Sequence, residues 1–130
     1  MRHLPTIARI LLGLVFTIFG LNFFFHFIPQ PPAPPAAGAF AGALFASGYL
    51  FPLLKVCEVA CGVALLAGRF VPLALAVLAP IVVNILFFHA FLHPAGLVLP
   101  LVVLALELFL AFCYRDAYRP MLQARNTPKL

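Results

Sequence analysis

Charged side chains and tryptophan are the residues that this sequence has least of. Asp, Glu, Lys and Arg together make up 8% of the 130 residues, only three residues are acidic, and tryptophan is absent. A typical soluble domain has about 25% charged residues, because polar groups must cover its surface. With 65% hydrophobic residues, the chain is excluded as a soluble globule, and we interpret it as an integral membrane protein.

The sequence also lacks the local motifs of the common enzyme classes. It contains no phosphate loop, nucleotide fingerprint or hydrolase triad. A metal site made from His26, His89 and Glu58 would have suitable ligand types, but their spacing matches no known metal motif, so we predict no metal site.

Cysteine is scarce, with three residues and no C-x-x-C pair. Cys57 and Cys61 are four residues apart, which on a helix separates their Cβ atoms by about 5–6 Å. A disulfide needs about 3.8 Å, so we expect these two and Cys113 to be free thiols that pack as small apolar side chains.

The apolar residues fall into four segments, each close to the roughly 20 residues that cross a hydrocarbon core of about 30 Å. Because every backbone amide in lipid needs an internal partner, these segments must be helices. The sequence therefore predicts an all-α polytopic membrane protein, a four-helix transmembrane bundle in a single domain over residues 1–130. The predicted spans are about 7–28, 49–67, 70–92 and 97–114.

The first connection has an unusual composition. The stretch "PQPPAPP" (Pro29–Pro35) cannot be helical and is expected to run as polyproline II. The next stretch, "AAGAFAGALFASGYL", places Phe40, Leu44 and Phe45 at helical spacing. This pattern predicts a short helix that lies in the outer membrane interface.

The basic residues indicate the orientation. Those next to the predicted spans lie before or in the first turn of span 1, between spans 2 and 3, or after span 4. They are Arg2, Arg9, Arg69, Arg115, Arg119, Arg125 and Lys129. The connections at 29–48 and 93–96 contain no Lys or Arg. The positive-inside rule then predicts that both termini are cytoplasmic, and it explains the net charge of +5 without a nucleic acid partner.

Two charges interrupt the second span, in "FPLLKVCEVACG". A central charged residue costs about 2.5–3.5 kcal/mol in membrane insertion, so these side chains should face protein or each other. Lys55 and Glu58 are three residues apart and can pair on one side of a helix. Cys61 and Gly62 continue that side with small residues, which lets a neighbouring helix approach closely.

Other polar residues of the spans lie at a similar depth, in the outer half or near the centre. The candidate set for a ligand-binding or proton site is Asn22, His26, Lys55, Glu58, Asn84, His89 and Glu107. Ionisable groups at membrane depth usually mark a functional site. The alternative is a structural network in which Lys55 pairs with Glu58 while Asn84 and Glu107 join helices.

Glu107 stands alone in "LVVLALELFLAF". No residue near it in the sequence can neutralise it, so it must be protonated or paired across the bundle. We expect it to face the same cavity as Lys55, Glu58 and Asn84, where one proton could be shared between the two carboxylates.

Three stretches resemble the DoxX family of small bacterial membrane proteins. They are "ARILLGLVFTIFGLNFFFHF", the segment from "SGYLFPLLKVCEVACG" to "VNILFFHAFL", and "YRDAYRPML". The most specific features are the K-x-x-E of the second span with the Gly that follows it, "RFVPLAL…AP…VN…FH" of the third, and the terminal "YRDAYRP". The resemblance implies a four-helix membrane bundle in the bacterial inner membrane. It also implies a redox link, because the family takes its name from a subunit of a thiosulfate:quinone oxidoreductase.

Two classes of function follow. In the first, the chain is a membrane subunit of an oxidoreductase complex, and a quinone or another small substrate is held at the polar residues. In the second, it is a non-enzymatic bundle that binds, carries or senses a small apolar or weakly acidic molecule. Both classes place the chain in a lipid bilayer, and a homo-oligomer is compatible with both.

Overall fold

Five α-helices and two single 3₁₀ turns make up the protein, as seen in a computed structural model that describes all 130 residues. It contains no strand, which confirms the all-α prediction. In chain order the elements are α1 (Leu4–Phe25), α2 (Pro35–Ala46), α3 (Leu50–Ala67), α4 (Val71–Leu92), η1 (Pro94–Gly96), α5 (Val98–Cys113) and η2 (Arg115–Ala117).

Helix α1 begins and ends three residues earlier than the predicted span 7–28, so that prediction is wrong in its bounds. Pro5 lies in the first turn, where its missing N–H costs no helical hydrogen bond. His26 ends the helix in the left-handed conformation, with φ 52°. The ends of the other three predicted spans agree with α3, α4 and α5 to one residue.

Three helices are long and apolar enough to cross a membrane: α1, α3 and α4. Helix α5 is apolar but has only 16 residues, which gives a length of about 24 Å at 1.5 Å per residue. The fourth predicted span, 97–114, is longer than α5 by one residue at each end, Leu97 and Tyr114. Helix α5 is the shortest of the four helices that form the bundle.

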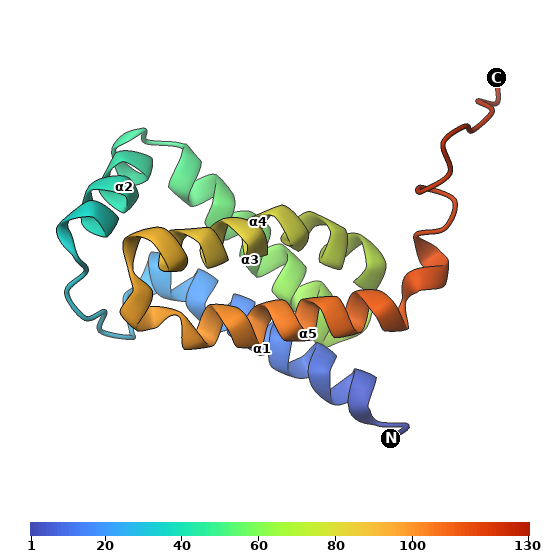
Figure 1. Cartoon of the computed structure of the whole chain (residues 1–130), viewed down its shortest axis with the longest axis horizontal. Coiled ribbons are helices and arrows are strands. Elements are labelled where there is room, and N and C mark those ends of the chain that lie inside the picture. The colour runs from blue at the N-terminus through green and yellow to red at the C-terminus, as the bar shows by residue number, and fades with distance from the viewer.

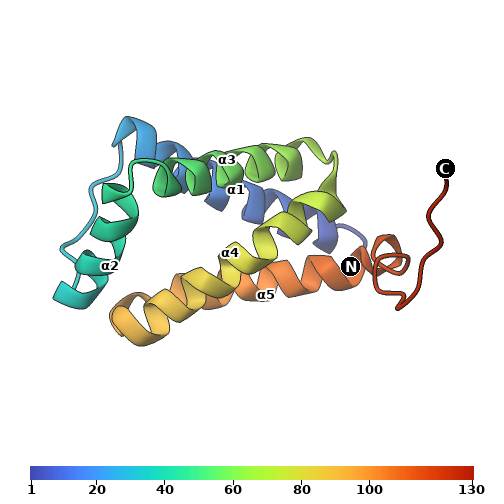
Figure 2. The same cartoon turned by 90° about the horizontal axis from the view of Figure 1, so that it is seen from above.

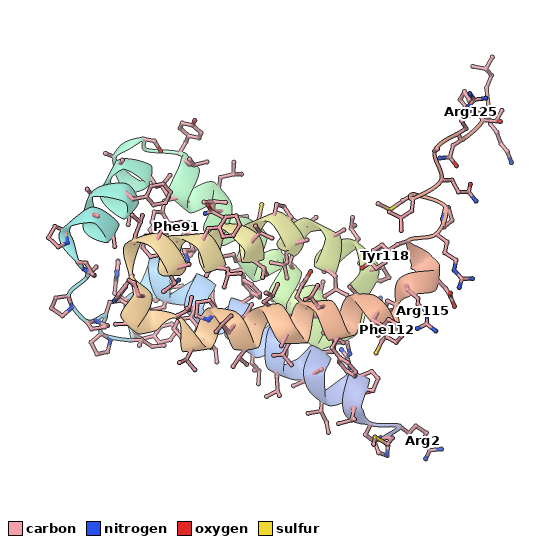
Figure 3. The ribbon with its side chains drawn as sticks, viewed as in Figure 1. Arg2, Phe91, Phe112, Arg115, Tyr118 and Arg125 are labelled. Atoms are coloured by element: carbon pink, nitrogen blue, oxygen red, sulfur yellow. The ribbon has the colours of Figure 1, made fainter.

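The bundle consists of two helix pairs, α1 with α3 and α4 with α5, as Figure 2 shows from above. Both termini lie at one end, and α2 and η1 lie at the other (Figure 1). We call these the inner end and the outer end. Arg2, Arg115 and Arg125 all lie at the inner end, whereas Phe91 lies towards the outer end (Figure 3).

The predicted short helix exists as α2, and it packs across the outer end of the bundle. The Phe40 ring lies 5.8 Å from the Phe88 ring of α4, measured between centroids. Phe45 lies 6.3 Å from Phe23 of α1, which in turn stacks on Phe51 of α3 at 5.0 Å. These aromatic contacts join α2 directly to α4 and α1, and through Phe23 to α3.

Glycines allow α1 and α3 to cross closely. A Cβ atom added to Gly62 would lie 2.5 Å from Thr17 Oγ1 and 2.8 Å from the Thr17 backbone nitrogen. A Cβ atom added to Gly13 would lie 2.9 Å from the Gly62 carbonyl oxygen. Small residues at such a crossing are the usual means by which membrane helices approach one another.

Arg9 has a structural role in addition to its charge. Its Nη1 donates hydrogen bonds to the carbonyl oxygens of Leu65 and Leu66, the latter at 3.2 Å. These carbonyls lie in the last turn of α3, where helical partners are missing and a cation is favoured by the helix dipole. Gly68, with φ 70°, then ends the helix beside the guanidinium.

The outer surface of the bundle is apolar. Only 20 of the 130 residues are buried, and large hydrophobic side chains are exposed along every long helix. Ile10, Val56, Val77 and Leu108 are examples, one from each helix of the bundle. Such a surface is suited to hydrocarbon, not to water.

Candidate functional site

The main cavity lies at the outer end of the bundle, beneath α2. Its volume is about 620 Å³, within the usual range of ligand sites. All five α-helices contribute to its wall. The wall is mostly apolar and includes five phenylalanines, Phe16, Phe19, Phe40, Phe51 and Phe88.

Four of the seven predicted site residues line this outer cavity: Lys55, Glu58, Asn84 and His89. Lys55 and Glu58 come from α3, and Asn84 and His89 come from α4. The structure therefore places these four together, as expected from their similar depth in the sequence.

Lys55 and Glu58 form an ion pair, with 3.1 Å between Lys55 Nζ and Glu58 Oε2. The side chain of Glu58 is 6% exposed and that of Lys55 is 20% exposed. The ammonium group also lies 5.3 Å from the centroid of the Phe51 ring, a cation–π distance. Lys55 is the only Lys or Arg on the cavity wall, and two of its three N–H groups remain available to a ligand.

The α4 side contributes an amide and an imidazole. Asn84 lines the cavity wall between Pro80 and Phe88. His89 Nδ1 lies 2.9 Å from the carbonyl oxygen of Ile85, so the tautomer that suits this contact carries its hydrogen on Nδ1 and leaves Nε2 as an acceptor. The His89 ring also stacks on His93 at 5.8 Å between centroids, which fixes its orientation.

Asn22 and His26 do not line the outer cavity. Asn22 is buried, and its Oδ1 accepts a hydrogen bond from the Ile28 backbone N–H at 2.7 Å. Its Nδ2 donates to the Ile28 carbonyl oxygen at 3.3 Å. His26 is exposed and caps the end of α1. These contacts satisfy the backbone where the chain leaves the helix.

Glu107 is only 5% exposed, so it faces the interior and not lipid. It does not share the outer cavity, however, and that prediction is wrong. It lines a second, inner cavity of about 300 Å³ with Leu75, Ala76, Ala79, Ala111 and Tyr118. The α4 residues that line the inner cavity, Leu75, Ala76 and Ala79, precede Asn84 by five to nine residues. At 1.5 Å per residue, the inner cavity therefore lies about 8–14 Å further inward along α4 than Asn84.

Tyr118 contributes to the wall of the inner cavity from beyond the end of α5, at the inner end of the bundle (Figure 3). Its hydroxyl donates a hydrogen bond to the Pro72 carbonyl oxygen at 2.7 Å and so attaches the C-terminal segment to the start of α4. Burial raises the pKa of the Tyr118 hydroxyl above its usual value, and the nearby carboxyl of Glu107 raises it further.

The sequence analysis did not identify the aromatic wall of the outer cavity or Gln30, which also lines it. The available signal was the concentration of Phe in the outer halves of three segments, which resembles the aromatic enrichment common near membrane interfaces. No group of three or more His, Cys, Asp and Glu side chains is placed to hold a metal ion, and the three cysteines are unpaired.

The sequence model of the DoxX family matches residues 4–94, which is 91 of the 130 residues. The chain belongs to the DoxX family. DoxX proteins form a membrane family, so this chain is a membrane protein, in agreement with its long apolar helices. Comparisons with curated proteins and with solved structures find no match.

The DoxX match has a clear relation to the two cavities. It runs from the start of α1 to the start of η1 and so includes Lys55, Glu58, Asn84 and His89. Helix α5 lies outside it, together with Glu107 and Tyr118. The polar part of the outer cavity therefore belongs to the DoxX segment, and the inner cavity is completed by the C-terminal part of the chain.

Proposed function

We propose that this DoxX protein binds a small apolar molecule with hydrogen-bond acceptors, of the quinone class, in the outer cavity. The observation that carries the proposal is the position of the Lys55–Glu58 pair, which lines a mostly aromatic and aliphatic chamber of about 620 Å³. A polar group costs free energy at membrane depth, and a ligand with matching polar atoms would offset that cost.

The chemistry of the wall suits a quinone headgroup. A quinone is a flat ring that packs on aromatic faces, and its two carbonyl oxygens need donors. Lys55 offers two N–H groups, and the exposed Asn84, which also lines the wall, makes no side-chain hydrogen bond within the protein. Glu58 is the only carboxyl group on the wall, so it is the one acid there that could exchange a proton with a bound ring.

The redox part of this proposal requires a partner. Reduction of a quinone to a quinol takes two electrons and two protons, and this chain has no cofactor-attachment motif. The electrons would come from a partner subunit that carries a redox cofactor, as the family resemblance suggests. In this account the protein's own residues bind and orient the ring, and they do not supply the electrons.

A second candidate is carriage or sensing of a weakly acidic apolar molecule without redox chemistry. The observation in its favour is the single cation Lys55 in an apolar chamber, because a carboxylate headgroup would pair with it. The two candidates differ in the headgroup that the cavity should prefer, and this difference decides the experiment.

Thermal unfolding in detergent with three probes of similar chain length tests both candidates. Decylubiquinone at a hundredfold excess over its Kd should stabilise the protein by about 2.7 kcal/mol, decanol should have little effect, and decanoic acid should be weaker than the quinone. Stronger stabilisation by decanoic acid would favour the second candidate. Equal stabilisation by all three would contradict a polar site in the cavity.

A matched pair of variants assigns that effect to the outer cavity. Ala41 lines it, whereas Ala43, on the same helix, is exposed and does not. Ala41→Trp should abolish stabilisation by decylubiquinone and Ala43→Trp should retain it. Loss in both variants, or in neither, would contradict binding at this place.

We also propose that the protein lies in the bacterial inner membrane with both termini in the cytoplasm. The basic residues at the inner end support this orientation (Figure 3). In a background with the native cysteines replaced by alanine, a membrane-impermeant maleimide on intact cells should label Ala39→Cys and should miss Gln123→Cys. Both positions are exposed on the protein, so the reverse pattern would contradict the orientation.

A further inference from the structure

Glu107 differs from the other buried polar side chains of the bundle. Three polar or charged residues are buried: Asn22, Glu58 and Glu107. Asn22 bonds to the backbone of Ile28, and Glu58 pairs with Lys55. Glu107 Oε2 is fully buried and has no hydrogen-bond partner. Burying an ionised oxygen without a hydrogen-bond partner costs free energy, so the question is what neutralises Glu107 in this position.

The wall of the inner cavity supplies acceptors and no cation. No Lys, Arg or His lines it. The hydroxyl hydrogen of Tyr118 is already donated to Pro72. Pro80 has no N–H, so the carbonyl of Ala76, a wall residue, lacks its partner within α4. The inner cavity therefore holds a carboxyl oxygen without a partner and no positive charge to neutralise it.

We propose that the inner cavity is a second site, separate from the outer one, at which Glu107 binds and exchanges a proton with the inner end of the bundle. A proton satisfies an isolated carboxylate with no further ligand, whereas hard metal cations take about six oxygen ligands, more than this wall offers. The neutral acid then has no charge to compensate and carries an O–H donor of its own.

The route to solution follows from the position of Tyr118. Every other wall residue belongs to α4 or α5, and Tyr118 lies beyond the end of α5 at the inner end. The groups that could compete for the proton are few. They are Tyr118 itself and the nearby Cys61 thiol of α3; α4 contributes no titratable residue to the wall.

Infrared spectroscopy tests this proposal with unusual clarity, because the chain has only three acidic residues. At neutral pH the full-length protein should show the C=O stretch of a protonated carboxylic acid. The band should disappear in Glu107→Gln and persist in Lys55→Met/Glu58→Gln, which has no carboxyl at position 58. Absence of the band from the parent protein, or its persistence in Glu107→Gln, would overturn the proposal.

Two further measurements test the identity of the bound species and its route. Replacing choline chloride with sodium chloride should leave the band unchanged. Loss of the band in sodium chloride would mean that Glu107 binds a metal cation in place of a proton, and it would overturn the proposal. Transfer to D₂O should shift the band, and Tyr118→Ala should make this shift several-fold faster. The control Phe112→Ala removes an exposed side chain at the same end and should not. An unchanged rate in Tyr118→Ala would overturn the inner route.

Discussion

Gly62→Leu should destabilise the bundle by at least about 3 kcal/mol, at or beyond the upper end of typical overpacking costs. Even a Cβ atom at this position would lie 2.5 Å from Thr17 Oγ1 and 2.8 Å from the Thr17 nitrogen. The nitrogen is backbone, so relief requires α1 and α3 to separate. This is the largest helix contact of the bundle, and thermal unfolding in detergent should show the loss directly.

The matched control for this prediction is Gly42→Leu. Gly42 lies in α2, and an added Cβ would have no atom within 4 Å. Replacing glycine there removes an unfavourable helix residue, so the variant should be as stable as the parent or slightly more stable. If Gly62→Leu unfolds at the same temperature as Gly42→Leu, α1 and α3 do not cross as described.

Glu58→Gln should destabilise the protein by about 3 kcal/mol, because it leaves the ammonium of Lys55 without its carboxylate in the outer cavity. The 20% exposure of the Lys55 side chain keeps the expected cost at the lower end of the range for buried pairs, since the ammonium can move towards the outer surface. Thermal unfolding in detergent measures the loss.

The double variant Lys55→Met/Glu58→Gln separates structure from binding. Replacing both members of a buried ion pair by groups of similar size is often neutral for stability, so this variant should recover most of what Glu58→Gln loses. Stabilisation by decylubiquinone should nevertheless be lost in the double variant, because the N–H donors of Lys55 are gone from the site. A double variant that binds the quinone as well as the parent would show that the ion pair has a structural role only.

The local parts of the site could be predicted from the sequence. The Lys55–Glu58 pair follows from a spacing of three residues on one helix. The short helix across the outer end follows from alanine-rich sequence with apolar residues at helical spacing. In each case the interacting residues are close in the chain, so helix geometry alone determines whether they meet.

The depth of Glu107 in the bundle, relative to the polar residues of α4, could not be predicted in the same way. It depends on how far α5 is shifted along α4, and that shift is set by packing along the whole length of two helices. Both are apolar on nearly every side, so their sequences do not specify which residues lie opposite each other. Glu107 lies near the middle of α5, but its assignment to the outer cavity was wrong.

Asn22 and Asn84 show a second limit of sequence analysis. Both precede a histidine by four or five residues near the outer end of an outward-running helix. Asn22 bonds to Ile28 where α1 ends, whereas α4 continues for eight residues past Asn84. Near Asn84 the backbone groups are already bonded within the helix, so its side-chain amide is not needed there. We therefore expect Asn84, and not Asn22, to be available to a ligand.

The central claim is that the outer cavity holds a quinone-class molecule, and mass spectrometry of what copurifies with the protein tests it most directly. Parent protein, Ala41→Trp and Ala43→Trp would be purified from the same membranes, and their organic extracts compared per mole of protein. We expect a quinone in near-stoichiometric amount with the parent and Ala43→Trp, and its loss from Ala41→Trp. Equal extracts from all three proteins, or a parent protein without any quinone, would contradict the claim.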